Sequence, residues 1–542
     1  MGLNSAARVW VRRSTKQQFI DARLRHLSLI VVSFAFFFFS PSTALGQLAP
    51  IKPQTGIGQV PQGTGACSVE TSCADLAPIM TRSALGPSPL EENLRYLANS
   101  IGERISGSMG ADNASGWAVE ALRHAGIDEV HTEKFTIPAG WTPAPAHVEI
   151  LSETNLSLEA VSAGWSPPTP EGGITANIAD VALGDAAGFA KAGSAVRGAI
   201  ALVHTVIPST WDGLRREREA GPAIVKRAQN MGAVAILWMA ARPDPLIERR
   251  NATVDGQIGE LPQAVIARAD AQRIAQLASG AKPVKAHFEM PNQVTGPVES
   301  ENIVAEIRGR ENPSQFVLLG AHLDSWGLGA GAIDDGCNAA LVIDAARVIH
   351  ANGTIPRRSI RFVLFTGEEQ GLLGSRAYAK IHSKALDGMV AAVIFDRGDG
   401  RLSGYSLGGR KDVLASVRTA LEPVQPLGIK EFTLDAPLFT DNFDFLLEGV
   451  PTLVANQDIA NFIVSDHTAS DTLDKVDIGE LKRHVAAAAI TAYALADAKT
   501  RIGRRQSRGE IDKLLQDTGL ERDMKATGNW SAWESGERGR AP

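Results

Sequence analysis

Cysteine is scarce in this chain, with 3 residues in 542. No cysteine pair with the spacing of a sulfur metal site is available. Cys67 and Cys73 lie close together in "CSVETSC", inside a stretch rich in glycine, proline and serine, and they form either a small-loop disulfide or two free thiols. Cys337 has no adjacent histidine to activate it, so we interpret it as a packing residue rather than a nucleophile.

An excess of basic charge is also missing. The 54 Lys and Arg residues are outnumbered by 60 Asp and Glu residues, and no long basic block follows the N-terminus. We therefore expect no nucleic-acid partner and a small or peptidic substrate. The motif HExxH and the P-loop are absent, and "GLGAGA" is a poor dinucleotide loop because an acidic pair follows it.

The N-terminal region has the order of an export signal. A basic stretch precedes the apolar run Leu27–Phe39, and Pro41 and small residues follow it. This order predicts a signal peptide over residues 1–46, cut before Gln47, and a periplasmic or secreted protein. The run is shorter than the roughly 20 residues of a spanning helix, so we expect no stable membrane span after cleavage. The alternative is a membrane anchor formed by the uncleaved segment.

The remaining chain is predicted to contain parts of different character. Residues 47–85 lack lasting periodicity and are expected to form a poorly ordered N-terminal arm. Apolar residues at helical spacing then predict two helices before Gly126. Short apolar runs separated by glycine and proline predict a separate β-rich module over residues 141–290. Residues 501–542 are expected to be a charged C-terminal tail.

Between these parts, apolar strands alternate with helices. The strands are "FVLLGAHLD", "RSIRFVLF", "MVAAVIFD" and "VPTLVAN", and helices are expected near 338–350 and 374–382. This alternation predicts an α/β domain with a mainly parallel, mixed sheet flanked by helices, built from residues 86–140 and 291–500. In such sheets, ligands bind beyond the carboxyl ends of the strands.

Acidic residues and histidines gather at these strand ends. The set is His322, Asp324, Asp334, Asp335, Glu368, Glu369, Asp396 and His467. Each of them alone is best interpreted as a polar residue that closes a strand. Together, carboxylates with two histidines predict a site for a hard-to-borderline divalent metal.

Five segments in this order resemble the M28 family of co-catalytic zinc exopeptidases, nearest its carboxypeptidase Q branch. They are "GAHLDSW", "GAIDDG", "FTGEEQGLLGS", "VIFD" and "DHTASDT". The resemblance covers about Leu90–Ala498. It implies the zinc exopeptidase fold and identifies residues 141–290 as an inserted protease-associated domain.

The resemblance also implies two Zn²⁺ ions per chain. One is held by His322, Asp334 and Asp396, and the other by Asp334, Glu369 and His467, so that Asp334 bridges the pair. Each ion then has three protein ligands and an open position, as catalytic zinc requires.

Neighbouring residues receive supporting roles from the same resemblance. Glu368 has the place of the general base, which takes a proton from water and passes it to the leaving amine. Asp324 is expected to orient His322 through its second ring nitrogen. Asp335 is expected to turn the chain after a cis peptide bond to Asp334, or to be the ligand itself if the register is shifted by one residue.

The implied function is an exported exopeptidase for short peptides or dipeptides, acting as an aminopeptidase, dipeptidase or carboxypeptidase. One alternative is a catalytically inactive receptor-like or binding protein on the same scaffold, against which the intact ligands and Glu368 argue. Another is a one-zinc acyl transferase similar to glutaminyl cyclases, against which the complete five-ligand set argues. A homodimer is compatible with the sequence.

Overall fold

A computed structural model describes residues 72–151 and 155–541. The predicted export signal and Cys67 lie outside the described residues, so export stays a prediction and the two alternatives for Cys67 and Cys73 stay untested. Among the helices of the described ranges, none has both the length and the apolar character needed to cross a membrane.

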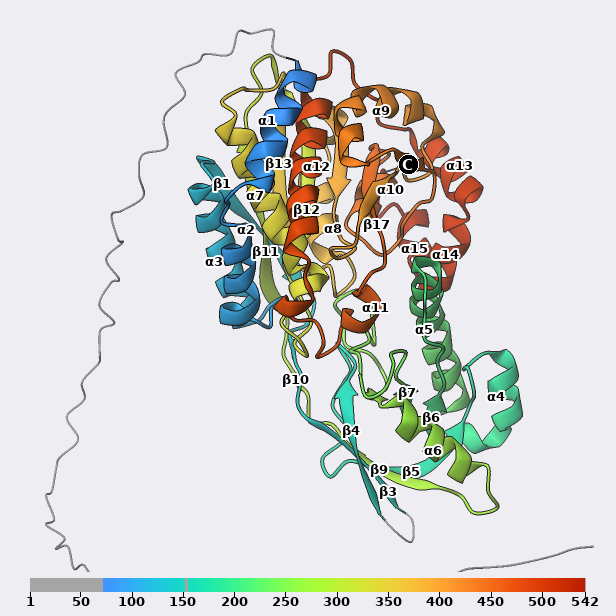
Figure 1. Cartoon of the computed structure of the whole chain (residues 1–542). Coiled ribbons are helices and arrows are strands. Elements are labelled where there is room, and N and C mark those ends of the chain that lie inside the picture. The colour runs from blue at the N-terminus through green and yellow to red at the C-terminus, as the bar shows by residue number, and fades with distance from the viewer. Residues whose placement is uncertain (1–71, 152–154, 542) are drawn as a thin grey trace, which may run out of the picture. The chain divides into compact units, whose positions relative to one another are not determined.

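The larger α/β part is built on an eight-stranded mixed sheet (Figure 1). The strand order is β1 (Glu129–Ile137), β11 (Val298–Ile307), β13 (Arg358–Phe365), β12 (Asn312–His322), β14 (Met389–Ile394), β17 (Thr452–Gln457), β15 (Leu402–Ser406) and β16 (Glu431–Thr433). The neighbours β13, β12, β14 and β17 run parallel, whereas the pairs β1–β11, β11–β13 and β15–β17 are antiparallel. The predicted mixed α/β fold is thus confirmed.

Helices cover both faces of this sheet, as Figure 1 shows. One face packs against α3 (Met109–His124), α7 (Cys337–Ala351) and α12 (Ile478–Asp497), and the other against α8 (Leu373–Ile381) and α10 (Asn442–Leu447). Helix α1 (Cys73–Leu85) packs on α7 and α12, and α2 (Leu90–Arg95) packs on α7. Alternate residues of β12 face opposite sides: Val317 and Leu319 pack under α7 and α12, while Leu318 packs with Tyr378 and Phe445. Burial on both faces explains why the central strands read as continuous apolar runs.

The second part, residues 146–151 and 155–289, is a closed barrel (Figure 1). Its strands are β3 (Ala146–Leu151), β4 (Leu156–Ser162), β8 (Gln263–Ile266), β7 (Ala235–Met239), β6 (Ile200–Val203), β5 (Ile174–Asp180) and β9 (Lys285–Glu289), joined by α4 (Ala186–Ala192), α5 (Trp211–Met231) and α6 (Arg268–Ala278). The short strands β2 (Trp141–Thr142) and β10 (Gln293–Val294) pair at its entry and exit.

Two hydrophobic clusters lie within residues 146–290. By compactness, however, the described residues form a single unit, so the division into domains stays a prediction.

Two segments are more regular than expected. The arm ends earlier than predicted, because residues 73–85 form α1, which buries Leu76, Met80 and Ala84 against the α/β part. The presumed tail contains α13 (Arg508–Thr518), α14 (Leu520–Thr527) and α15 (Trp530–Glu534). These helices bury Leu515 and Trp533 against α10. They are amphipathic, and the charged residues of their exposed faces made the segment look like a charged tail in the sequence.

Candidate metal centre

Four neighbouring strands bring the predicted metal-binding side chains to one edge of the sheet. His322 ends β12, Glu369 follows β13, Asp396 follows β14, His467 follows β17, and Asp334 lies in the π-helical turn η3 (Ala332–Gly336) before α7. The carboxyl ends of parallel strands meet at one edge, so residues up to 145 positions apart in sequence become neighbours there (467 − 322).

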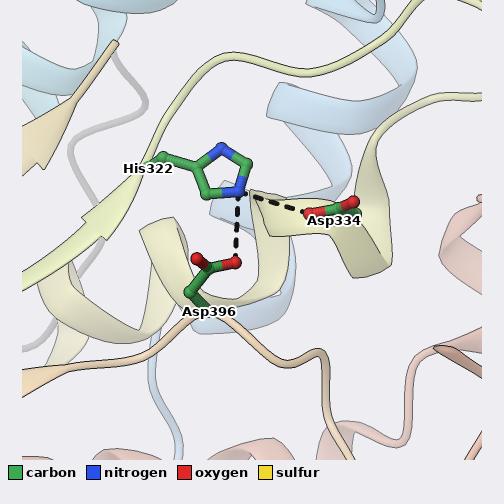
Figure 2. A group of neighbouring side chains, drawn as sticks. All are labelled: His322, Asp334 and Asp396. Carbon is green, nitrogen blue, oxygen red and sulfur yellow. Dashed lines mark ion pairs between the residues drawn. The ribbon is translucent and has the colours of Figure 1, made fainter. Parts of the chain in front are cut away.

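The side chains form two triads that share Asp334. Nε2 of His322 lies 3.2 Å from Oδ1 of Asp334 and 3.4 Å from Oδ1 of Asp396 (Figure 2). Nε2 of His467 lies 3.4 Å from Oδ2 of Asp334 and 2.9 Å from Oε2 of Glu369. Within each triad the ligand atoms lie within 4.8 Å of one another. The two oxygens of Asp334 therefore face two different histidines.

Both histidines are oriented through the other ring nitrogen. Nδ1 of His322 lies 3.0 Å from the carbonyl oxygen of Asp324, and Nδ1 of His467 lies 3.0 Å from the carbonyl oxygen of Arg249. A carbonyl only accepts hydrogen bonds, so Nδ1 must carry the proton and donate it. Nε2 of the neutral ring is then left with a lone pair that points into the triad, as metal binding requires.

The charge balance of this site fits bound cations. Asp334, Glu369 and Asp396 are buried, and in the described part of the chain none of them forms an ion pair with Lys or Arg. Oδ2 of Asp396 and Oε1 of Glu369 have no hydrogen-bond partner among the described residues. Burying such carboxylates without a cation is costly, and the nitrogen and oxygen donor set suits zinc.

Glu368 lines the cavity into which the triads open, but it belongs to neither triad. Its backbone N–H and that of Glu369 donate hydrogen bonds to the two carboxylate oxygens of Asp324, and both bonds are 3.3 Å long. Burial and the nearby charge of Asp396 raise the pKa of Glu368 well above its usual value. Asp324 thus holds the Glu368–Glu369 backbone as well as His322, which is more than the single role expected from sequence.

Asp335 points away from the triads. Its carboxylate accepts hydrogen bonds from the backbone N–H of His322 at 3.2 Å and from Nδ2 of Asn338 at 2.6 Å. The shifted register that would make Asp335 the ligand is therefore not seen. The Asp334–Asp335 peptide bond is cis, as predicted.

Several supporting residues were not assigned from the sequence. The carboxylate of Asp471 accepts hydrogen bonds from the backbone N–H groups of Ile333 and Asp334, at 2.6 and 3.2 Å. Its place in "DHTASDT" was a signal that could have suggested this role. The buried Arg104 donates hydrogen bonds to carbonyl oxygens of the loop between His322 and Asp334. Because Arg104 lies more than 200 residues before this loop, no local sequence pattern pointed to its role.

The barrel residues also reach the site. The backbone N–H of Arg249 donates to the carbonyl of His467 at 2.9 Å, and Nδ2 of Asn251 donates to the carbonyl of Glu369 at 2.5 Å. Asp466, next to His467, is paired with Arg218 of α5 and with Arg242. The loops of residues 141–290 therefore fix the backbone of two predicted ligands without supplying a member of either triad.

The triads open into a cavity of about 980 Å³. Its walls come from Trp211 and Arg218 of α5, from the 434–440 loop, and from α13 and α14. Glu368 therefore faces a space that lies between the barrel's long helix and the C-terminal helices.

Comparison with known proteins agrees with this geometry. Residues 302–492 match the model of peptidase family M28. Carboxypeptidase Q of Mus musculus is 28% identical over 408 residues, which cover 75% of this chain and 85% of the relative. Aminopeptidase YwaD of Bacillus subtilis is 24% identical over 446 residues, which cover 78% and 88%.

A solved structure, the peptidase M28 precursor from Shewanella amazonensis, is 28% identical with a TM-score of 0.72, over 80% of this chain and 99% of that one. The family suggested by the five sequence segments is confirmed. The chain thus carries a peptidase family M28 domain, homologous to carboxypeptidase Q and aminopeptidase YwaD, and is a zinc metallopeptidase.

Proposed function

We propose that this protein is an exported, co-catalytic dizinc exopeptidase that hydrolyses short peptides. The observation that carries the proposal is the shared carboxylate of Asp334, whose two oxygens face His322 and His467 in two complete triads. His322 and Asp396 would hold one zinc ion, Glu369 and His467 would hold the second, and Asp334 would bind both. Zinc there would supply Lewis acidity that polarises the scissile carbonyl and makes water a stronger acid.

Glu368 is the proposed general base. It takes a proton from the attacking water while the water oxygen bonds to the carbonyl carbon, and it delivers that proton to the leaving amine as the C–N bond breaks. Asp324 supports this role because it holds the backbone N–H groups of Glu368 and Glu369 together. With this backbone fixed, one glutamate can serve as a ligand while its neighbour stays free to carry protons.

The cavity walls support an exopeptidase for small substrates. Helix α5 and the C-terminal helices α13 and α14 border the cavity that contains Glu368, so long or folded chains would meet both walls. We propose that residues 141–290 are an inserted protease-associated domain that restricts access in this way. The N-terminal sequence supports export, which mass analysis of the mature protein from the extracellular or periplasmic fraction would test.

The central experiment compares Glu368→Gln with Glu369→Gln in the zinc-loaded protein. Glu368→Gln should lower turnover of a dipeptide and blocked-peptide panel by about 10²-fold to 10⁴-fold and keep two zinc ions per chain. Glu369→Gln should lose one zinc ion as well as activity, because it removes a ligand. Glu171→Gln, the same change at an exposed position, is the control and should alter neither property.

The same measurements separate the alternatives. Loss of a zinc ion from Glu368→Gln would reverse the roles of the two glutamates. A wild-type protein that holds two zinc ions but cleaves no peptide would favour a binding protein. A zinc content near one per chain, with cyclisation of an N-terminal glutamine, would favour an acyl transferase.

A further inference from the structure

Arg397 lies beside the proposed reaction centre. It directly follows Asp396 at the end of β14 and lines the cavity that contains Glu368. Its guanidinium carbon lies 5.2 Å from the ring centroid of Trp211, the first residue of α5. A cation at this distance from an indole face is held by attraction to the ring.

Trp211 is itself fixed in place. Its Nε1 donates a hydrogen bond of 2.9 Å to the carbonyl of Gln457 at the end of β17, and its ring centroid lies 4.8 Å from that of Phe462. Arg397 therefore stacks on a side chain that spans from the barrel to the sheet. This arrangement limits where the guanidinium can lie, and it costs the arginine little further entropy to bind an acceptor.

No acceptor for this guanidinium is present in the described part of the chain. The Arg397 side chain donates no hydrogen bond and forms no ion pair there, although it is partly buried. By contrast, Arg218 on the same cavity wall is paired with Asp466. Asp435 and Asp396 attract Arg397 electrostatically, but neither comes within ion-pair distance of it. The guanidinium N–H groups therefore stay without an acceptor among the described residues, which is costly for a partly buried cation.

We propose that Arg397 binds a carboxylate of the substrate and makes this peptidase prefer short peptides that carry one. The proposal rests on the proposed peptidase function of the adjoining site. The planar guanidinium presents paired N–H donors that match a carboxylate, which is a stronger acceptor than a neutral carbonyl or amide. The carboxylate comes either from the free C-terminus of a dipeptide or from an acidic side chain, and the two sources are separable by substrate choice.

The test compares three substrates. Alanyl-leucine has a free C-terminal carboxylate, alanyl-leucine amide has none, and alanyl-isoglutamine has a carboxylate only on its side chain. We expect Arg397→Met to lower kcat/KM by about 10-fold to 100-fold for the substrate whose carboxylate it binds, the range expected for a hydrogen bond to a charged group. The amide should change by less than about threefold, and a loss confined to alanyl-leucine or to alanyl-isoglutamine identifies the source.

Two further variants sharpen the result. Arg397→Lys keeps the charge but lacks the paired donors, so its loss should be intermediate. Lys411→Met removes an exposed cation that lines the same cavity and serves as the matched control, with little effect on any substrate. Zinc content and the thermal unfolding midpoint of Arg397→Met should equal those of wild type, since Asp396 is retained.

The proposal is overturned if Arg397→Met affects all three substrates equally, affects none, or behaves like Lys411→Met. Calorimetric binding of leucine, leucinamide and isoglutamine to the zinc-loaded proteins keeps the test independent of turnover. Binding of a carboxylate ligand that depends on Arg397, in a wild-type protein that cleaves no peptide, would contradict the proposed function and leave this inference standing. Binding that ignores Arg397 would overturn the inference even if the peptidase is active.

Discussion

Asp471 holds the turn that presents Asp334, the proposed shared ligand. Its Oδ1 accepts the backbone N–H of Ile333 at 2.6 Å, and its Oδ2 accepts that of Asp334 at 3.2 Å. The side chain is 4% exposed, so water does not readily replace these hydrogen bonds. Asp471→Asn exchanges one of the two oxygens for an NH₂ group, which cannot accept. Whichever oxygen is replaced, one backbone N–H of the turn loses its partner.

The expected cost follows from that loss. A buried donor without an acceptor costs about 1–3 kcal/mol, and the turn can relieve this cost only by moving Asp334. Changes of this kind around a metal ligand lower metal affinity by about 10-fold to 100-fold, which corresponds to about 1.4–2.8 kcal/mol. Since Asp334 belongs to both triads, both zinc-binding steps should weaken in Asp471→Asn.

Competition with a chromogenic zinc chelator measures both steps. The matched control is Asp474→Asn, the same exchange three residues along, at a side chain that is 69% exposed and pairs with Lys475. It should bind zinc as wild type does. Unchanged zinc affinity in Asp471→Asn would refute the reasoning about the turn. Weakening of only one step would mean that Asp334 does not serve both ions.

Two other predictions concern stability. Arg538 donates two hydrogen bonds of 2.7 Å to the buried Asp444 of α10. Arg538→Met should therefore leave the Asp444 charge uncompensated and lower the free energy of unfolding by about 3–5 kcal/mol, measured as a lower urea midpoint. Arg522→Met, the same change at an exposed arginine, should lower it little. A midpoint equal to that of wild type would show that the C-terminal helices do not depend on this pair. Chelation of the metal should lower the thermal unfolding midpoint, because bound zinc stabilises only the folded state, and zinc but not magnesium should restore it. Equal rescue by magnesium would contradict a site that relies on His322 and His467.

The local sequence was sufficient to predict the central sheet and a cluster of candidate metal ligands at its edge. Each strand of the parallel core is a short apolar run, and each predicted ligand stands within a few residues of a strand end or in a short motif. The rule that parallel strands end at one edge then places His322, Glu369 and Asp396 together without further information. The resemblance to family M28 assigned the pairs, and it also predicted the cis bond after Asp334.

The amphipathic helices at the two ends of the chain were less apparent. Residues 73–85 and 508–534 carry few large apolar side chains among many polar or small ones, so their pattern is weak until a partner surface is known. Burial of Met80 and Trp533 depends on α12 and α10, which lie far away in sequence. Propensity alone does not decide such segments, because most of a helix's stability comes from the face that it packs.

What only the tertiary structure decided is how distant segments support the site. Arg104 binds the loop beside His322 from more than 200 residues away, and the barrel carbonyl of Arg249 orients His467 across a similar separation. The guanidinium of Arg397 is likewise positioned by its stacking on Trp211 of α5. The sequence by itself determined the candidates for metal binding, because short motifs at strand ends are local. Their orientation, and the cavity beside them, arise from contacts between distant segments that form only when the chain packs.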